Sequence, residues 1–167
     1  MRLFFLPLLF SLILLQCNST YAQTENPLES QITSFMTGLQ SENPKQTVEL
    51  WVLGLNNRSG AVQYALLSPS LQRKTRKQFE ERGWGTGQSS PWVDNVQITK
   101  VVNISDEKVK FTITYDLLSS YKNFGSGQKV ITLEKNPETG KRTWFIIQIV
   151  TKYNQYEGFT PAETVTK

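Results

Sequence analysis

The sequence predicts an α+β domain in which helices come first and a sheet follows. Apolar residues recur at helical spacing over residues 28–79 and at twofold spacing from residue 92 to residue 150. Helices that precede a run of consecutive strands favour helices packed in the concave face of a curved, mainly antiparallel sheet of about four strands. At 167 residues, the chain is long enough for one such domain.

The first 22 residues have the pattern of a signal peptide. Arg2 gives a positive start, an apolar run covers residues 3–15, and Thr20 and Ala22 form a small-residue cleavage site. The apolar run is too short for a permanent membrane span. We therefore expect the protein to be exported, with a mature chain that begins at Gln23.

The single cysteine, Cys17, allows an alternative for the N-terminus. A lipoprotein signal places a lipid-modified cysteine after a short apolar run, but Gln16 stands where such signals have Gly, Ala or Ser. Lipidation of Cys17 would make the protein a membrane-anchored sensor or a cell-wall-associated module. Cleavage after Ala22 would instead leave a mature chain without cysteine, and so without a disulfide or a thiol nucleophile.

We divide the rest of the chain into a helical extension (23–43), the main domain (44–153) and a C-terminal tail (154–167). The extension starts with a capping Asn followed by Pro at the first helical position. Its apolar stripe should pack against the domain. The tail loses periodicity, and we expect it to fray. The stripe consists of Leu28, Ile32, Phe35, Met36 and Leu39.

Three helices open the main domain. The first begins at Asn43-Pro44 and is apolar nearly all round, with Trp51 and Leu53 on different sides, which predicts a buried helix. A short helix covers residues 61–67, and a last one runs from Ser68-Pro69 to Gly83. The charges of this last helix are not interleaved with aromatic residues, so we interpret them as a solvated face and predict no nucleic-acid partner. The formal net charge of +4 does not change this interpretation.

Four strands follow the helices. The strand over 109–117 alternates cleanly between apolar and polar residues, 130–134 is a shorter strand, and 144–150 is apolar on both faces. Residues 136–140 form a hairpin loop between the last two. In the first strand, the expected inner face carries two polar exceptions, Asp94 and Lys100. The apolar residues of that face are Trp92, Val96, Ile98, Val102 and Ile104.

The region from Pro44 to Pro69 contains a helix with Trp51, then the turn Leu55-Asn56-Asn57-Arg58-Ser59-Gly60-Ala61, then Tyr64-Ala65-Leu66-Leu67-Ser68-Pro69. With the four strands up to Val150, this order resembles the nuclear transport factor two-like superfamily, especially its bacterial extracytoplasmic members. The resemblance implies a cone-shaped domain with a hydrophobic pocket in a concave sheet, and a homodimer formed through the open sheet face. The superfamily includes dehydratases, isomerases and epoxide hydrolases beside accessory domains without chemistry, so function has to be argued from the site.

Candidate catalytic residues are few because the chain contains no histidine. The His–Asp pair of dehydratase-like members therefore has no counterpart here, and Cys–His and Ser–His nucleophiles are excluded in the mature chain. Asp94 is the candidate for a carboxylate base, with Tyr115 or Tyr64 as the donor to an oxyanion. These residues define the alternative of a small isomerase- or dehydratase-type enzyme. No metal site and no cofactor is predicted, because the paired acids lack the spacing of a metal loop.

The sequence favours an exported, non-enzymatic binding or accessory domain. Its pocket or sheet face would hold a small apolar ligand or a partner protein, and the aromatic residues of the domain are the candidates for the pocket wall. Those candidates are Trp51, Tyr64, Trp84, Trp92 and Tyr115.

Overall fold

The structure, a computed structural model, describes residues 27–135 and 143–167. The predicted signal peptide, Cys17 and the 136–140 hairpin loop lie outside this part of the chain. Four helices come first: α1 (Pro27–Gly38), α2 (Pro44–Asn56), α3 (Gly60–Ala65) and α4 (Pro69–Glu81). Five strands follow: β1 (Trp92–Ser105), β2 (Lys108–Leu118), β3 (Asn123–Lys135), β4 (Trp144–Lys152) and β5 (Glu163–Thr166).

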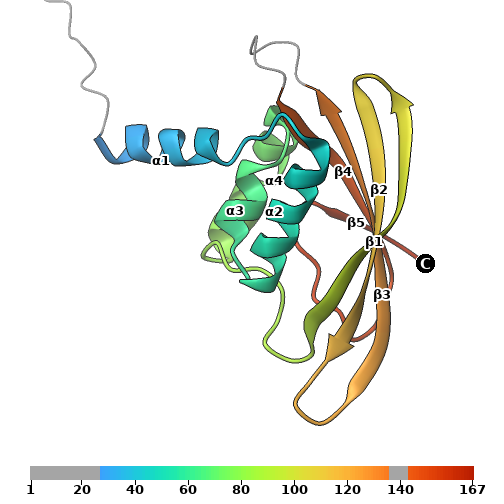
Figure 1. Cartoon of the computed structure of the whole chain (residues 1–167). Helices are drawn as coiled ribbons and strands as arrows, with labels where there is room; N and C mark the ends of the chain where they lie inside the picture. Colours follow the sequence, from blue (N-terminus) through green and yellow to red (C-terminus); the bar gives the residue numbers. More distant parts are fainter. Residues whose placement is uncertain (1–26, 136–142) are drawn as a thin grey trace, which may run out of the picture.

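The predicted α+β class is confirmed, with five strands rather than about four. The strands form one open sheet in the order β1-β2-β3-β4-β5. Strands β1 to β4 are antiparallel neighbours, and β5 adds a parallel edge beside β4. Helices α2, α3 and α4 lie together on one face of this sheet, whereas α1 extends away from them (Figure 1).

The core lies between α2 and the sheet. Trp51 is fully buried in α2 and packs with the inner residues of β2, whose predicted alternation is confirmed from Val109 to Leu117. Burial of each such large apolar side chain contributes about 1.5–3 kcal/mol. Leu53 is 53% exposed, so the prediction of an α2 buried on all sides was wrong. One face of α2 meets water because the helix packs on the sheet from one side only.

Local sequence signals explain where the helices begin. The side chain of Asn43 accepts a hydrogen bond from Lys45 N, and Pro44 is the first residue of α2. Ser68 and Pro69 start α4 in the same way. Between α2 and α4, the N–H of Gly60 donates to Trp84 O. A Cβ at Gly60 would lie 2.7 Å from that oxygen. The turn after α2 therefore requires glycine, and it joins the helices to the loop that leads into the sheet.

Strand β1 differs from the prediction because it contains bulges. The pairing with β2 shifts between Asp94 and Gln97, where Asn95 has a φ of 50°. Such a shift exchanges the two faces of a strand. Trp92 is consequently exposed, and a second shift, between Ile98 and Lys100, leaves Val102 and Ile104 exposed as well. Val93, Val96 and Ile98 are the residues that pack against the core.

The apolar stripe of α1 packs only at its C-terminal end. Met36 and Leu39 contact the core, whereas Ile32 and Phe35 are 51% and 53% exposed. The expectation that the whole stripe packs against the domain was therefore wrong. Helix α1 extends away from the other helices and meets the body of the domain at its C-terminal end (Figure 1).

The C-terminal tail is an ordered part of the domain, which corrects the expectation of fraying. Strand β5 pairs with β4 from Ile149–Glu163 to Lys152–Thr166, and Tyr153 N donates to Thr166 O. The segment between the two strands carries Glu157, which is buried. Polar contacts hold this segment in place together with two ring contacts, Phe124 with Tyr156 and Tyr153 with Phe159.

Candidate functional site

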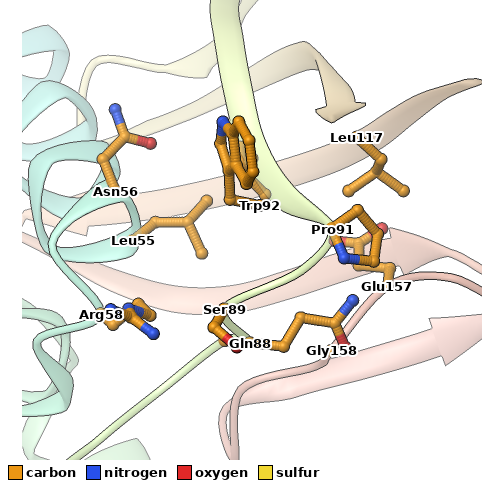
Figure 2. Close-up of a pocket in the computed structure, with 12 residues that line it drawn as sticks. Leu55, Asn56, Arg58, Gln88, Ser89, Pro91, Trp92, Leu117, Glu157 and Gly158 are labelled. Atoms are coloured by element: carbon orange, nitrogen blue, oxygen red, sulfur yellow. The ribbon is translucent and has the colours of Figure 1, made fainter. Parts of the chain in front are cut away.

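A pocket of about 280 Å³ lies where the end of α2, the loop before β1 and the segment after β4 meet (Figure 2). Its wall mixes apolar side chains with one acid, one base and several neutral polar groups. The lining residues are Leu55, Asn56, Arg58, Gly87, Gln88, Ser89, Pro91, Trp92, Val93, Leu117, Glu157 and Gly158.

Backbone and amide hydrogen bonds hold the three parts of this wall together. Thr86 N donates to Arg58 O at 3.1 Å, which joins the loop before β1 to the turn after α2. The side-chain amide of Gln88 donates to Tyr156 O and joins the same loop to the segment after β4. The pocket is therefore built on tertiary contacts between segments about 30 and 70 residues apart in the chain.

Of the five aromatic candidates, only Trp92 lines the pocket. It is 36% exposed, and in Figure 2 it lies with Leu55 and Asn56 on one side of it and Pro91 and Leu117 on the other. Tyr64 and Trp84 instead pack edge-to-face with a centroid distance of 5.2 Å, and both contact Phe79. Trp84 thus holds the Gly-rich loop against the helices rather than presenting a free ring to a ligand.

Trp51 and Tyr115 are core residues. The indole Nε1 of Trp51 is buried and has no hydrogen-bond partner in the described part of the chain. Tyr115 is 2% exposed, and its hydroxyl donates to Glu157 Oε1. Tyr115 therefore reaches the pocket indirectly, through a carboxylate that lines it.

A buried network of charged side chains lies beside the pocket. Lys129, on β3, is fully buried and forms ion pairs with Glu157 and with Glu163. Its Nζ lies 2.8 Å from Glu163 Oε2 and 3.3 Å from Thr151 Oγ1. All three donors of the ammonium group are thus used, which a lysine at this depth requires.

The two carboxylates differ in how completely they are satisfied. Glu163 Oε2 also accepts from Thr151 Oγ1 at 2.7 Å, and Glu163 Oε1 accepts from Thr160 Oγ1 at 2.9 Å. Glu157 Oε1 accepts from both Lys129 and Tyr115. Glu157 Oε2, in contrast, is buried and accepts no hydrogen bond from the described residues. Leaving such an acceptor unmatched costs about 1–3 kcal/mol, and more for a charged group.

This network also carries an excess of negative charge. One ammonium faces two carboxylates, and the nearby tyrosine is neutral at ordinary pH. Burial raises the pKa of the Tyr115 hydroxyl far above its usual range, and the charge of Glu157 and its hydrogen bond add to this rise. Tyr115 consequently remains a hydrogen-bond donor at ordinary pH.

Sequence reasoning missed Lys129, Glu157 and Glu163. Lys129 shares the inner face of β3 with Ile131 and Leu133, so the alternation of that strand places a lysine among buried residues. The predicted strand began at Val130 and excluded it. Glu157 and Glu163 fall in the segment that was expected to fray, where no periodic pattern marks a buried acid. The burial of Lys129 could thus have been predicted from the alternation of the strand. The burial of Glu157 and Glu163 could not.

Asp94, the candidate base, lies outside the pocket. Its side chain is exposed, its Oδ1 accepts from Asn95 N at 2.8 Å, and it faces Asp116 across the strand pair. Asn95 also donates to Asp116 Oδ2 at 2.9 Å. Asp94 therefore has a structural role in the bulge of β1.

We expect Asp94→Asn to change the free energy of unfolding by no more than about 0.5 kcal/mol, as at other exposed positions. Asn retains an acceptor for Asn95 N, and the change removes a like-charge pair across the strands. Urea unfolding checks this expectation, with Asp116→Asn as the control on the facing strand. A loss above about 1 kcal/mol would show that the carboxylate does more than close the bulge.

Within residues 27–135 and 143–167, no group of three or more potential metal-ligating side chains comes together. None of the helices in these ranges is both long and apolar enough to cross a membrane. Comparison with protein-family models, with curated proteins and with solved structures finds no match to the chain.

Proposed function

We propose that this protein is an exported, non-enzymatic binding domain that holds a small ligand in the pocket between α2, the loop before β1 and the segment after β4. The observation that carries the proposal concerns Glu157, which lines this pocket. Its Oε2 is a buried carboxylate oxygen that accepts no hydrogen bond from residues 27–135 and 143–167. A ligand that supplies the donor would remove the cost of leaving that oxygen unmatched.

The composition of the wall supports binding. Leu55, Trp92 and Leu117 offer apolar surface, and Asn56 and Gln88 offer amide groups. Small-molecule sites commonly combine apolar walls with a few placed polar groups. Several hydrogen bonds already join the segments of the wall, so the pocket is largely formed before a ligand arrives.

A binding role accounts for these residues better than the isomerase-type alternative. That alternative depends on Asp94, which is exposed and outside the pocket wall. Glu157 is the acid at the pocket, and its Oε1 is engaged by Lys129 and Tyr115. A carboxylate held by two donors is suited to fix a ligand in one orientation rather than to move during a reaction.

Two further parts of the proposal come from the sequence. The charged start, apolar run and small-residue site of the first 22 residues support export. The order of segments between Pro44 and Pro69, together with helices on one face of an open sheet, supports a relationship to the nuclear transport factor two-like superfamily. We include the cone shape of that superfamily in the proposal.

The test is thermal unfolding with a panel of small amines, carboxylates, alcohols and sugars. At least one compound class should raise the Tm of the wild type by about 5–10 °C at a concentration of 100 times its Kd. Asn56→Trp should abolish this rise, because the indole would occupy the pocket that Asn56 lines.

Asn57→Trp is the matched control for this experiment. Asn57 is the next residue, is also exposed, and lies outside the pocket lining. The control should retain the rise in Tm. If no class of compound raises Tm, or if Asn56→Trp responds as strongly as Asn57→Trp, the pocket is not a binding site.

A further inference from the structure

The pocket wall carries two charged side chains of opposite sign. Figure 2 shows Arg58 and Glu157 on opposite sides of the pocket, with the apolar surface of Leu55 and Trp92 between them. Arg58 follows the end of α2 and is exposed, whereas the side chain of Glu157 is 2% exposed. The two ends of the pocket therefore present different electrostatic environments to a ligand.

The Glu157 end favours a cationic hydrogen-bond donor over a neutral one. Lys129 is shared between two carboxylates, so the buried network has one positive and two negative charges. Glu157 Oε2 is the carboxylate oxygen of this network that accepts no hydrogen bond from the described residues. An ammonium group would supply both the missing donor and the missing positive charge, whereas a hydroxyl would supply only the donor.

The Arg58 end favours an anionic acceptor. A guanidinium group presents donors in a fork that matches the two oxygens of a carboxylate. Asn56 also lines the pocket, and its amide is a second neutral donor in the wall. Between the two ends, the Trp92 ring and the Leu55 side chain are suited to an aliphatic or aromatic body.

We propose that the ligand is a small zwitterion with an ammonium group at one end, an apolar middle and a carboxylate at the other end. This inference rests on the proposed function of the pocket. The ammonium donates to Glu157 Oε2, and the carboxylate accepts from Arg58. Glu157 Oε1 keeps its hydrogen bonds from Lys129 and Tyr115, so Oε2 is the oxygen left to accept from the ligand.

The test uses four probes that share one six-carbon chain: 6-aminohexanoate, hexylamine, hexanoate and 1-hexanol. Isothermal titration calorimetry should rank 6-aminohexanoate tightest, hexylamine and hexanoate weaker, and 1-hexanol weakest. Glu157→Gln should weaken 6-aminohexanoate and hexylamine about tenfold or more while leaving hexanoate unchanged, because only the two amines use Glu157. Arg58→Gln should weaken 6-aminohexanoate and hexanoate while leaving hexylamine unchanged.

Glu157→Gln also touches the buried network, so circular dichroism must show that this variant is folded. Asn56→Trp provides a second test that leaves the network intact, and it should abolish binding of all four probes. The ligand class is overturned if hexanoate or 1-hexanol binds as tightly as 6-aminohexanoate, or if folded Glu157→Gln binds every probe as the wild type does.

Two different results separate a wrong ligand class from a pocket that binds no ligand. If the four probes do not bind but another compound class raises Tm in the wild type and not in Asn56→Trp, the zwitterion is wrong and the binding function stands. If no compound of any class binds, both proposals fall.

Discussion

Replacing Lys129 by Met is expected to lower the free energy of unfolding by about 3–5 kcal/mol, the cost of removing one partner from a buried ionic network. The methionine fills a similar volume but leaves Glu157 and Glu163 without their shared cation. Three hydrogen bonds from the lysine ammonium, to the two carboxylates and to Thr151, disappear at the same time. Since single domains have a total stability of about 5–15 kcal/mol, this one substitution brings the protein close to unfolding.

The matched control is Lys108→Met. Lys108 also lies on a strand and faces an acid, Glu134, on the neighbouring strand, but the two side chains are 35% and 45% exposed and their charged atoms are 3.6 Å apart. An exposed pair of this kind contributes about 1 kcal/mol or less. Urea unfolding at pH 7 compares the two variants. If Lys129→Met is no less stable than Lys108→Met, the expectation is wrong. The carboxylates would then tolerate the loss of their cation, for example by binding a proton.

Gly127→Ala is the second substitution for which we expect a large loss, about 3 kcal/mol in the free energy of unfolding. A Cβ at Gly127 would lie 2.1 Å from Tyr115 Cε2 and 2.6 Å from its hydroxyl oxygen. The ring cannot move aside freely, because it is buried and its hydroxyl donates to Glu157. The alanine therefore either strains the core or breaks this hydrogen bond to a charged group.

Three further variants show whether the ring of Tyr115 is the cause: Ser126→Ala, Tyr115→Leu, and the double variant with Tyr115→Leu and Gly127→Ala. Ser126→Ala, at the exposed neighbouring position, should leave stability within about 0.5 kcal/mol of the wild type. Tyr115→Leu in the Gly127→Ala background should cost less than the sum of the two single changes, because leucine ends before the ring atoms that the new Cβ meets. Urea unfolding of the four variants measures this coupling, and strict additivity would contradict the proposed clash.

The alternation of β2 illustrates what sequence can predict well. Its five inner residues, from Val109 to Leu117, alternate with polar residues, and the structure buries all five. The start of α2 is equally local, because Asn43 and Pro44 act on the first turn of the same helix. Such features depend on residues a few positions apart, so the order of the four helices and the first four strands follows from the chain alone.

Strand β1 shows where a local pattern misleads. Its apolar residues predict one inner face, but the bulge at Asn95 moves the strand by one residue and exchanges its faces. A bulge depends on the pairing with β2 as well as on its own residues. Trp92 consequently lies at the pocket rather than in the core, and Asp94 lies in the solvent rather than in a pocket.

By itself, the sequence determined the α+β class, the helix starts and the inner face of β2, because capping and periodicity are properties of neighbouring residues. Its composition also determined the absence of histidine chemistry. Only the tertiary structure decided which polar groups are buried together. Lys129 contacts Glu157 and Glu163, which lie 28 and 34 residues further along the chain. Both acids belong to a C-terminal segment without any periodic pattern. The meeting of such groups depends on how the strands are paired and on what covers the edge of the sheet, and no local pattern encodes either.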